Sequence, residues 1–193
     1  IQLRALRGGA PVALTLNPVP ACRGRVEVRL ANDFDAVSDG VMVQVSVRLL
    51  EDYPADFVAA VMAHEYAHLL LDHAARMRAQ GVDFGILSGF GRNVRYFRQT
   101  ETEADILSVA VLVNAGYPAD LPVRFWNAFG PEHADGAVTL RTYPAWRDRV
   151  ATMAHEAARI GRDPVLPVVP PILSARERPL DGDWRTLLVR ARR

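Results

Sequence analysis

One stretch decides how this sequence is interpreted: His64-Glu65-Tyr66-Ala67-His68. If the stretch is helical, residues four apart lie on one face, one turn from each other, so both imidazoles can reach the same ion. Glu65 follows the first histidine and can contact a water on that ion without replacing a ligand. The spacing therefore predicts a metal-bearing helix with a general base beside the metal.

The surroundings of this stretch favour a buried helix. Apolar residues precede and follow it, namely Phe57, Val58, Val61, Met62, Leu69, Leu70 and Leu71, with alanines between them. A helix that is apolar nearly all round lies in the interior of a protein. Two histidines and a glutamate are costly there unless something pairs with them, and a metal ion does so. The alternative is a pair of core histidines satisfied by ordinary hydrogen bonds.

A catalytic zinc site takes three protein ligands and leaves the fourth position to water. The candidates for the third ligand are Glu101, Glu103, Asp105, His73 and His133. On the helix expected from about residue 100 to residue 116, Glu101 and Asp105 share a face, whereas Glu103 lies about 200° around from Glu101. One carboxylate of the shared face can bind metal while the other hydrogen-bonds a ligand histidine. The alternative is that these acids lie in the first turn of a helix, where the helix dipole stabilises negative charge. The spacing alone therefore leaves the third ligand open.

Three further histidines are expected at the surface. The helix that carries His68 is expected to run over residues 54–80. On such a helix His73 lies about 140° from His68, so it is expected to face solvent. We expect His133 in a surface loop and His155 in a late amphipathic segment.

Residues 40–48 show the clearest strand pattern. One face would carry Val41, Val43, Val45 and Val47. A period of two is expected when one face of a sheet is buried and the other is open. Residues 1–21 are expected to form a hairpin around a Gly-Gly turn, and residues 25–30 another strand. Two shorter helices are expected near 120–129 and 144–160.

The composition excludes some classes of protein. The 193 residues carry a net charge of +1, which argues against a nucleic-acid binder held by phosphate contacts. No apolar run reaches about 18 residues, so no membrane span is expected. Cys22 is the single cysteine, which rules out a disulfide within the chain.

The last part of the chain, residues 163–193, begins with a proline-rich, extended stretch. Its apolar residues are expected to dock on the preceding domain, namely Val165, Leu166, Val168, Val169, Ile172 and Leu173. The alternative is that they form a crystal or dimer contact. We expect a short helix from residue 183 to the end, anchored by Trp184, Leu187 and Leu188.

Two separated motifs, residues 64–68 and Glu101-Thr102-Glu103-Ala104-Asp105, make the chain resemble the HtpX and CAAX-prenyl-protease family of gluzincin metallopeptidases. The closer likeness is to the soluble bacterial branch, and it covers roughly residues 22–160. Residues 1–21 resemble the last hairpin of a PDZ domain, which precedes the peptidase domain in some bacterial members. The expected organisation is therefore this hairpin, a zinc metallopeptidase domain over residues 22–162, and the tail.

The resemblance implies a role for each matching residue. His64, His68 and Glu101 would bind zinc, because the glutamate four residues before the Ala-Asp aspartate is the family's third ligand. Glu65 would be the general base. Asp105 would support a ligand histidine.

One motif departs from the family. The usual Thr-His-Pro stretch is Thr142-Tyr143-Pro144 here, and the arginine expected five residues later is Arg149. The family's histidine is thought to touch the active site, and the tyrosine in its place can still donate a hydrogen bond to an oxyanion. The alternative is an ordinary half-buried tyrosine.

The resemblance implies an α+β fold, with a small antiparallel sheet packed on the metal-bearing helices, and one Zn²⁺ per chain. Zinc lowers the pKa of a bound water toward about 7, Glu65 takes the proton, and Tyr143 or Arg149 helps to stabilise the oxyanion. The peptide or unfolded protein substrate would add a strand along the edge formed by Val41, Val43 and Val45. The compartment implied is the bacterial cell envelope, in particular the periplasm. There are two rival interpretations. One is an inactive relative that binds peptides or acts as a chaperone, and the other is a binding module in which the PDZ-like hairpin matters most.

Overall fold

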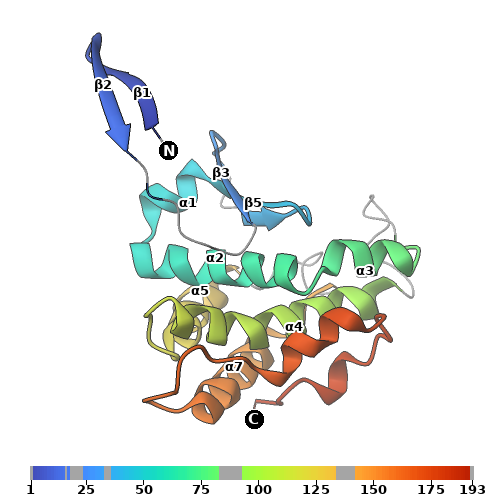
Figure 1. Ribbon diagram of the computed structural model, residues 1–193. Helices are drawn as coiled ribbons and strands as arrows, with labels where there is room; N and C mark the ends of the chain where they lie inside the picture. Colours follow the sequence, from blue (N-terminus) through green and yellow to red (C-terminus); the bar gives the residue numbers. More distant parts are fainter. Residues whose placement is uncertain are drawn as a thin grey trace.

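The computed structural model describes residues 2–15, 17, 24–32, 36–82, 93–133 and 142–191. Its strands are β1 (Gln2–Arg7), β2 (Ala10–Thr15), β3 (Arg25–Arg29), β4 (Ala36–Ser38) and β5 (Met42–Ser46). Its α-helices are α1 (Val47–Asp52), α2 (Ala55–Leu70), α3 (His73–Ala79), α4 (Asn93–Asn114), α5 (Leu121–His133) and α7 (Trp146–Ile160), and two 3₁₀ turns follow, η1 (Pro171–Glu177) and η2 (Trp184–Thr186). The predicted α+β class is confirmed. Figure 1 shows the layers, with the strands β3 and β5 on one side of α2, and α4 and then α7 on the other.

The sheet that lies on α2 is mixed, not antiparallel as predicted. Its strand order is β3-β5-β4, and β3 pairs with β5 in parallel. A tight turn joins β4 to β5 and makes that pair antiparallel. β4 occupies one edge of β5, and β3 pairs with the other edge and runs in the same direction as β5. The predicted hairpin near the start of the chain is confirmed, with β1 and β2 joined through Gly8 and Gly9 at positive φ.

The strand predicted to receive substrate is the central strand of this sheet. β5 is paired on both sides, so it offers no free edge, and the prediction of an edge strand at Val41, Val43 and Val45 is wrong. Val43 and Val45 are each 1% exposed and belong to the core, whereas Val41 precedes the strand and is 61% exposed. Among the described strands of this sheet, β3 and β4 form the edges.

The turn before β5 lies close to α3. Asp39 Oδ1 accepts hydrogen bonds from the backbone N–H groups of Val41 and Met42, at 2.7 and 2.8 Å. Gly40 has a φ of +92°, and a Cβ there would lie 2.6 Å from the Cβ of Ala74. A larger residue at position 40 would therefore push the sheet away from the helix.

The helix predicted over residues 54–80 is two helices. α2 ends at Leu70, and α3 begins at His73 after a break at Leu71 and Asp72. Asp72 adopts the left-handed conformation, with a φ of 53°, a conformation that ends a helix and redirects the chain. The side chains of α3 therefore do not continue the faces of α2.

Small residues bring α2 and α4 together. Ala63, Ala67 and Ala104 are at most 5% exposed and lie in the clusters that fill the space between these helices and their neighbours. Alanine at a helix contact allows the two backbones to approach closely. The opposite side of α2 packs on the sheet through a cluster that includes Val58. The predicted burial of this helix follows from contacts on both sides.

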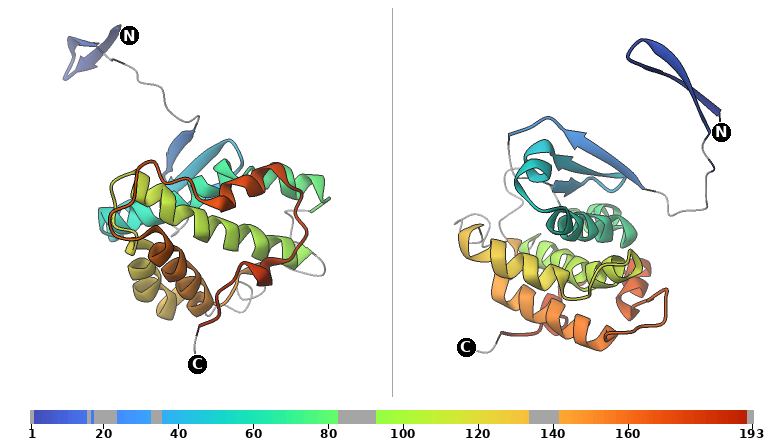
Figure 2. Two further views of the ribbon diagram at one scale, coloured as in Figure 1. Left: turned by 60° about the horizontal axis from the view of Figure 1, so that its bottom comes forward. Right: turned by 90° about the vertical axis from the view of Figure 1, so that its left-hand side faces the viewer.

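The C-terminal segment docks on the helices, as Figure 2 shows from two directions. Ile172 and Leu173 of η1 pack against the cluster formed by α2 and α4, and Trp184 is 5% exposed. Three of the residues predicted to dock do not, because Val165, Leu166 and Val169 are 91%, 58% and 69% exposed. The helix predicted from residue 183 to the end is a single 3₁₀ turn over the described residues.

Some predictions are not tested by the fold. Cys22 lies outside the described residues. The domain boundaries near residues 22 and 163, and the likeness of the hairpin to part of a PDZ domain, stay predictions. Within the described part of the chain, every helix is too short or too polar to cross a membrane.

Candidate metal centre

Three predicted ligands from two helices converge on one point. His64 and His68 lie one turn apart on α2, and their Nε2 atoms are 3.2 Å from each other. Glu101, in the middle of α4, places Oε2 3.2 Å from His64 Nε2 and Oε1 3.5 Å from His68 Nε2. The packing of α2 against α4 thus brings the carboxylate of Glu101 to two imidazoles that lie 37 and 33 positions before it in the sequence.

These distances suit a zinc ion. Zinc binds imidazole nitrogen and carboxylate oxygen at about 2.0–2.2 Å in a tetrahedral arrangement, so two ligand atoms lie about 3.3–3.5 Å apart. The three separations, 3.2, 3.2 and 3.5 Å, are close to that spacing. Two imidazoles and one carboxylate are also the protein ligands of one common class of catalytic zinc site.

Glu65 groups with His64 and His68 as a further side chain of α2 that could contact a metal. One of its carboxylate oxygens is within 4.8 Å of ring nitrogens of both His64 and His68. The side chain is half-buried. A carboxylate at this distance can contact a water held at the cluster.

Asp105 and Arg149 support the His64 side of the cluster. Asp105 Oδ1 lies 3.1 Å from His64 Nδ1, although the approach is not aligned as a hydrogen bond. Arg149 of α7 donates two hydrogen bonds of 2.7 Å to Asp105, and its Nη2 lies 3.6 Å from Glu101 Oε2. Burial would raise the pKa of Asp105, but the Arg149 guanidinium holds it below its usual value.

The charges of the cluster favour a cation. Burial would lower the pKa of His64, but the carboxylates of Asp105 and Glu101 outweigh burial and raise it to about 10. Burial lowers the pKa of His68 well below its usual value. Burial would raise the pKa of Glu101, but His64, His68 and Arg149 hold it at about 2. The carboxylates are therefore ionised, and positive charge is stabilised where they meet the imidazoles.

Tyr143 lies next to Arg149 at the border of the site. The Arg149 guanidinium carbon is 5.6 Å from the centre of the Tyr143 ring and 4.0 Å from that of Trp126 on α5. Tyr143 is 38% exposed. The tyrosine thus borders solvent and a guanidinium that contacts two carboxylates of the cluster.

The prediction of His73 at the surface is wrong. Its side chain is 3% exposed because the break at Asp72 turns α3 and directs the ring toward the site. Its Nδ1 lies 2.7 Å from His68 Nδ1, and its Nε2 lies 3.1 Å from Glu103 Oε2. Glu103 does point away from Glu101, as the helical geometry predicts. A sequence signal existed, since an acid inside a buried helix requires a partner.

The other two histidines were placed with mixed success. His155 is exposed on α7, as predicted. His133 is the last residue of α5 and not part of a loop.

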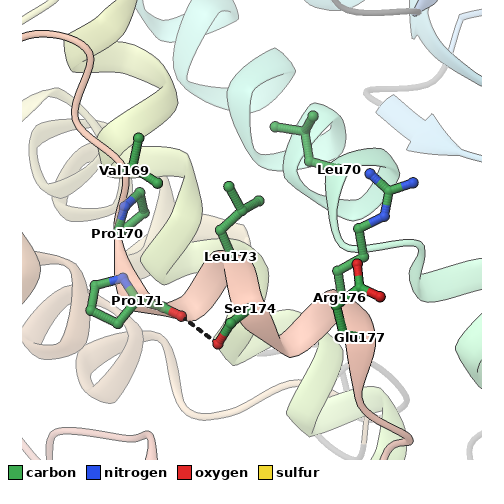
Figure 3. Close-up of a pocket in the computed structure, with 8 residues that line it drawn as sticks. All are labelled: Leu70, Val169, Pro170, Pro171, Leu173, Ser174, Arg176 and Glu177. Carbon is green, nitrogen blue, oxygen red and sulfur yellow. Dashed lines mark hydrogen bonds between the residues drawn. The ribbon is translucent and has the colours of Figure 1, made fainter.

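A separate shallow hollow of about 600 Å³ lies between the end of α2 and η1. Figure 3 shows Leu70 on one side and Leu173 on the other, with Arg176 beside them. The predicted site residues do not line it. The hollow is therefore distinct from the histidine cluster.

Comparison with known proteins supports a peptidase. The model of peptidase family M48 matches residues 30–95, about a third of the chain and a shorter stretch than the predicted resemblance. No curated protein and no solved structure gives a significant match. The matched stretch contains residues 64–68 and ends before Glu101. Proteins of this family are zinc metallopeptidases, so the match supports an HtpX-like M48 family, a metallopeptidase role and a peptide substrate.

Proposed function

We propose that this chain, which matches peptidase family M48 over residues 30–95, is a zinc-dependent endopeptidase with His64, His68 and Glu101 as the metal ligands. The observation that carries the proposal is the convergence of the three side chains from α2 and α4 at distances of 3.2–3.5 Å. The family match supports the chemistry, and the geometry supports the choice of ligands.

The protein's own groups have separate tasks in the proposed reaction. A zinc ion bound at the cluster would supply a Lewis acid and lower the pKa of water. Glu65 accepts the proton of the attacking water and passes it to the leaving amine. Asp105, fixed by Arg149, lies 3.1 Å from His64 Nδ1 and would hold the ring, with Nε2 facing His68 and Glu101, once this contact aligns as a hydrogen bond.

Tyr143 is the proposed donor to the oxyanion. Its position beside Arg149 supports this role, since that guanidinium also lies 3.6 Å from Glu101. The hydroxyl can donate a hydrogen bond where negative charge develops, and Arg149 adds positive charge nearby.

Replacing Tyr143 by phenylalanine is expected to lower kcat on the order of 10²-fold with a smaller change in KM, since one oxyanion donor is removed. The measurement is steady-state cleavage of a fluorogenic peptide. Tyr117→Phe is the matched control, because Tyr117 is 37% exposed and lies after α4. Equal kcat values for Tyr143→Phe and wild type would exclude the role.

Casein cleavage tests the proposed function as a whole. The purified chain is expected to cleave casein, to lose this activity after dialysis against a chelator, and to regain it when zinc is added back. Failure to cleave casein or unfolded protein with zinc bound would favour the rival, an inactive relative that binds peptides or acts as a chaperone. The periplasm as the compartment stays a prediction, which fractionation of the source cells would test.

A further inference from the structure

A second histidine lies directly behind the ligand His68. The Nδ1 atoms of His68 and His73 are 2.7 Å apart, and their ring centres are 4.8 Å apart. At this distance one nitrogen donates a proton and the other accepts it. His73 is 3% exposed, so water does not compete effectively for the contact.

The other nitrogen of His73 is held by a carboxylate. Its Nε2 lies 3.1 Å from Glu103 Oε2, and Glu103 is 2% exposed. Arg76 donates to both oxygens of Glu103, at 2.7 and 3.3 Å, and Gln99 Nε2 donates to Oε1 at 2.9 Å. The carboxylate is thus fixed by three side chains from α3 and α4.

The C-terminal segment fixes the far end of this network. Arg76 Nε donates to the backbone carbonyl of Arg178 at 2.9 Å. Gln99 Oε1 accepts the backbone N–H of Gly182 at 2.7 Å. The partners of Glu103 are therefore oriented by a part of the chain far from α2 in sequence.

The chemistry of these groups sets the direction of every hydrogen bond. Arg76 only donates and an ionised Glu103 only accepts, so the proton between Glu103 and His73 belongs to His73 Nε2. A neutral His73 then has a free lone pair on Nδ1, and His68 must donate from its own Nδ1. This leaves the lone pair of His68 on Nε2, the atom that faces His64 and Glu101.

We propose that His73 is a positioning residue that fixes the tautomer and the ring orientation of His68 through a relay from Arg76 and Glu103. This inference rests on the proposed function, because it assigns His68 Nε2 to the metal. Metal-binding histidines commonly donate their second nitrogen to a carboxylate, carbonyl or water. Here a second imidazole stands between the ligand and the carboxylate, whereas His64 faces the carboxylate of Asp105 directly.

Zinc affinity tests the relay without reference to turnover. His73→Leu removes both ring nitrogens and is expected to raise the zinc Kd by about 10–100-fold, measured by competition with a chromophoric chelator. His73→Asn is expected to restore part of the affinity, since the carboxamide oxygen lies near the place of Nδ1 and can accept from His68. The control is His155→Leu, at an exposed histidine of α7, which is expected to bind zinc like the wild type.

The outcomes separate this inference from the proposed function. A wild-type chain that binds no zinc contradicts the proposed function. A wild-type chain that binds zinc, with a His73→Leu variant of unchanged Kd and intact helical signal, overturns the relay alone.

A measurement on the zinc-loaded wild type covers the case in which His73→Leu fails to fold. Long-range ¹H–¹⁵N correlation spectra of the imidazoles are expected to place protons on His68 Nδ1 and His73 Nε2. A proton on His73 Nδ1 would reverse the hydrogen bond and overturn the proposal.

Discussion

Glu65→Gln is expected to bind zinc and fold like the wild type while its kcat for peptide cleavage falls by about 10²–10⁴-fold, the usual contribution of a general base. The substitution keeps the shape of the side chain and removes only its ability to take a proton. The three converging donors come from His64, His68 and Glu101, so the metal site itself is left intact.

Two measurements on the same preparation are needed to interpret this variant. Zinc content and thermal unfolding of the variant are expected to match those of the wild type. The lost turnover is then due to the loss of proton transfer. Glu51→Gln, at an exposed glutamate of α1, makes the same chemical change away from the site and is expected to leave kcat unchanged. Full peptidase activity in a clean Glu65→Gln preparation contradicts the assignment of Glu65 as the base.

Helical periodicity was sufficient to predict half of the arrangement at the site. Residues four apart share a helix face, so His64 and His68 had to face the same way, and so did Glu101 and Asp105. In the structure both acids approach His64, at 3.2 and 3.1 Å. The choice of Glu101 over Glu103 came from the family resemblance, and the structure turns Glu103 toward His73.

The relay behind His68 could not be predicted from periodicity. A continuous helix would direct His73 toward solvent, but the left-handed residue Asp72 interrupts the helix just before it. The two neighbours of Asp72 are both buried, since Leu71 is 0% exposed and His73 is 3% exposed. The partners of Glu103 come from α3 and α4, and the C-terminal segment holds two of them, Arg76 and Gln99, so only the tertiary packing reveals them.

Strand pairing was the least predictable part of the fold. The alternation of valines predicted a strand over residues 40–48, whereas β5 spans Met42–Ser46 and α1 begins at Val47. Of the four valines of the predicted face, Val43 and Val45 are buried in β5. Alternation does not report which edges are paired, and β4 and β3 cover both edges of β5. A substrate strand would therefore have to pair with one of the outer strands, not with β5 as predicted.

Removal of Glu101 is expected to have the second large effect, the loss of bound zinc. Glu101 supplies the only carboxylate, among the described residues, within 3.5 Å of both His64 Nε2 and His68 Nε2. Glu101→Ala leaves two imidazoles, one fewer than the three protein ligands of a catalytic zinc site. Glu103→Ala is the matched comparison, since it removes the same group two positions away and leaves the three donors in place.

The decisive measurement is the zinc content of the wild type, Glu101→Ala and Glu103→Ala after equilibration with excess zinc and removal of the unbound metal. We expect one zinc per chain in the wild type, none retained by Glu101→Ala, and zinc retained by Glu103→Ala with weakened affinity. A stoichiometric zinc in Glu101→Ala, or its loss in Glu103→Ala alone, would contradict the assignment of His64, His68 and Glu101 as the metal site.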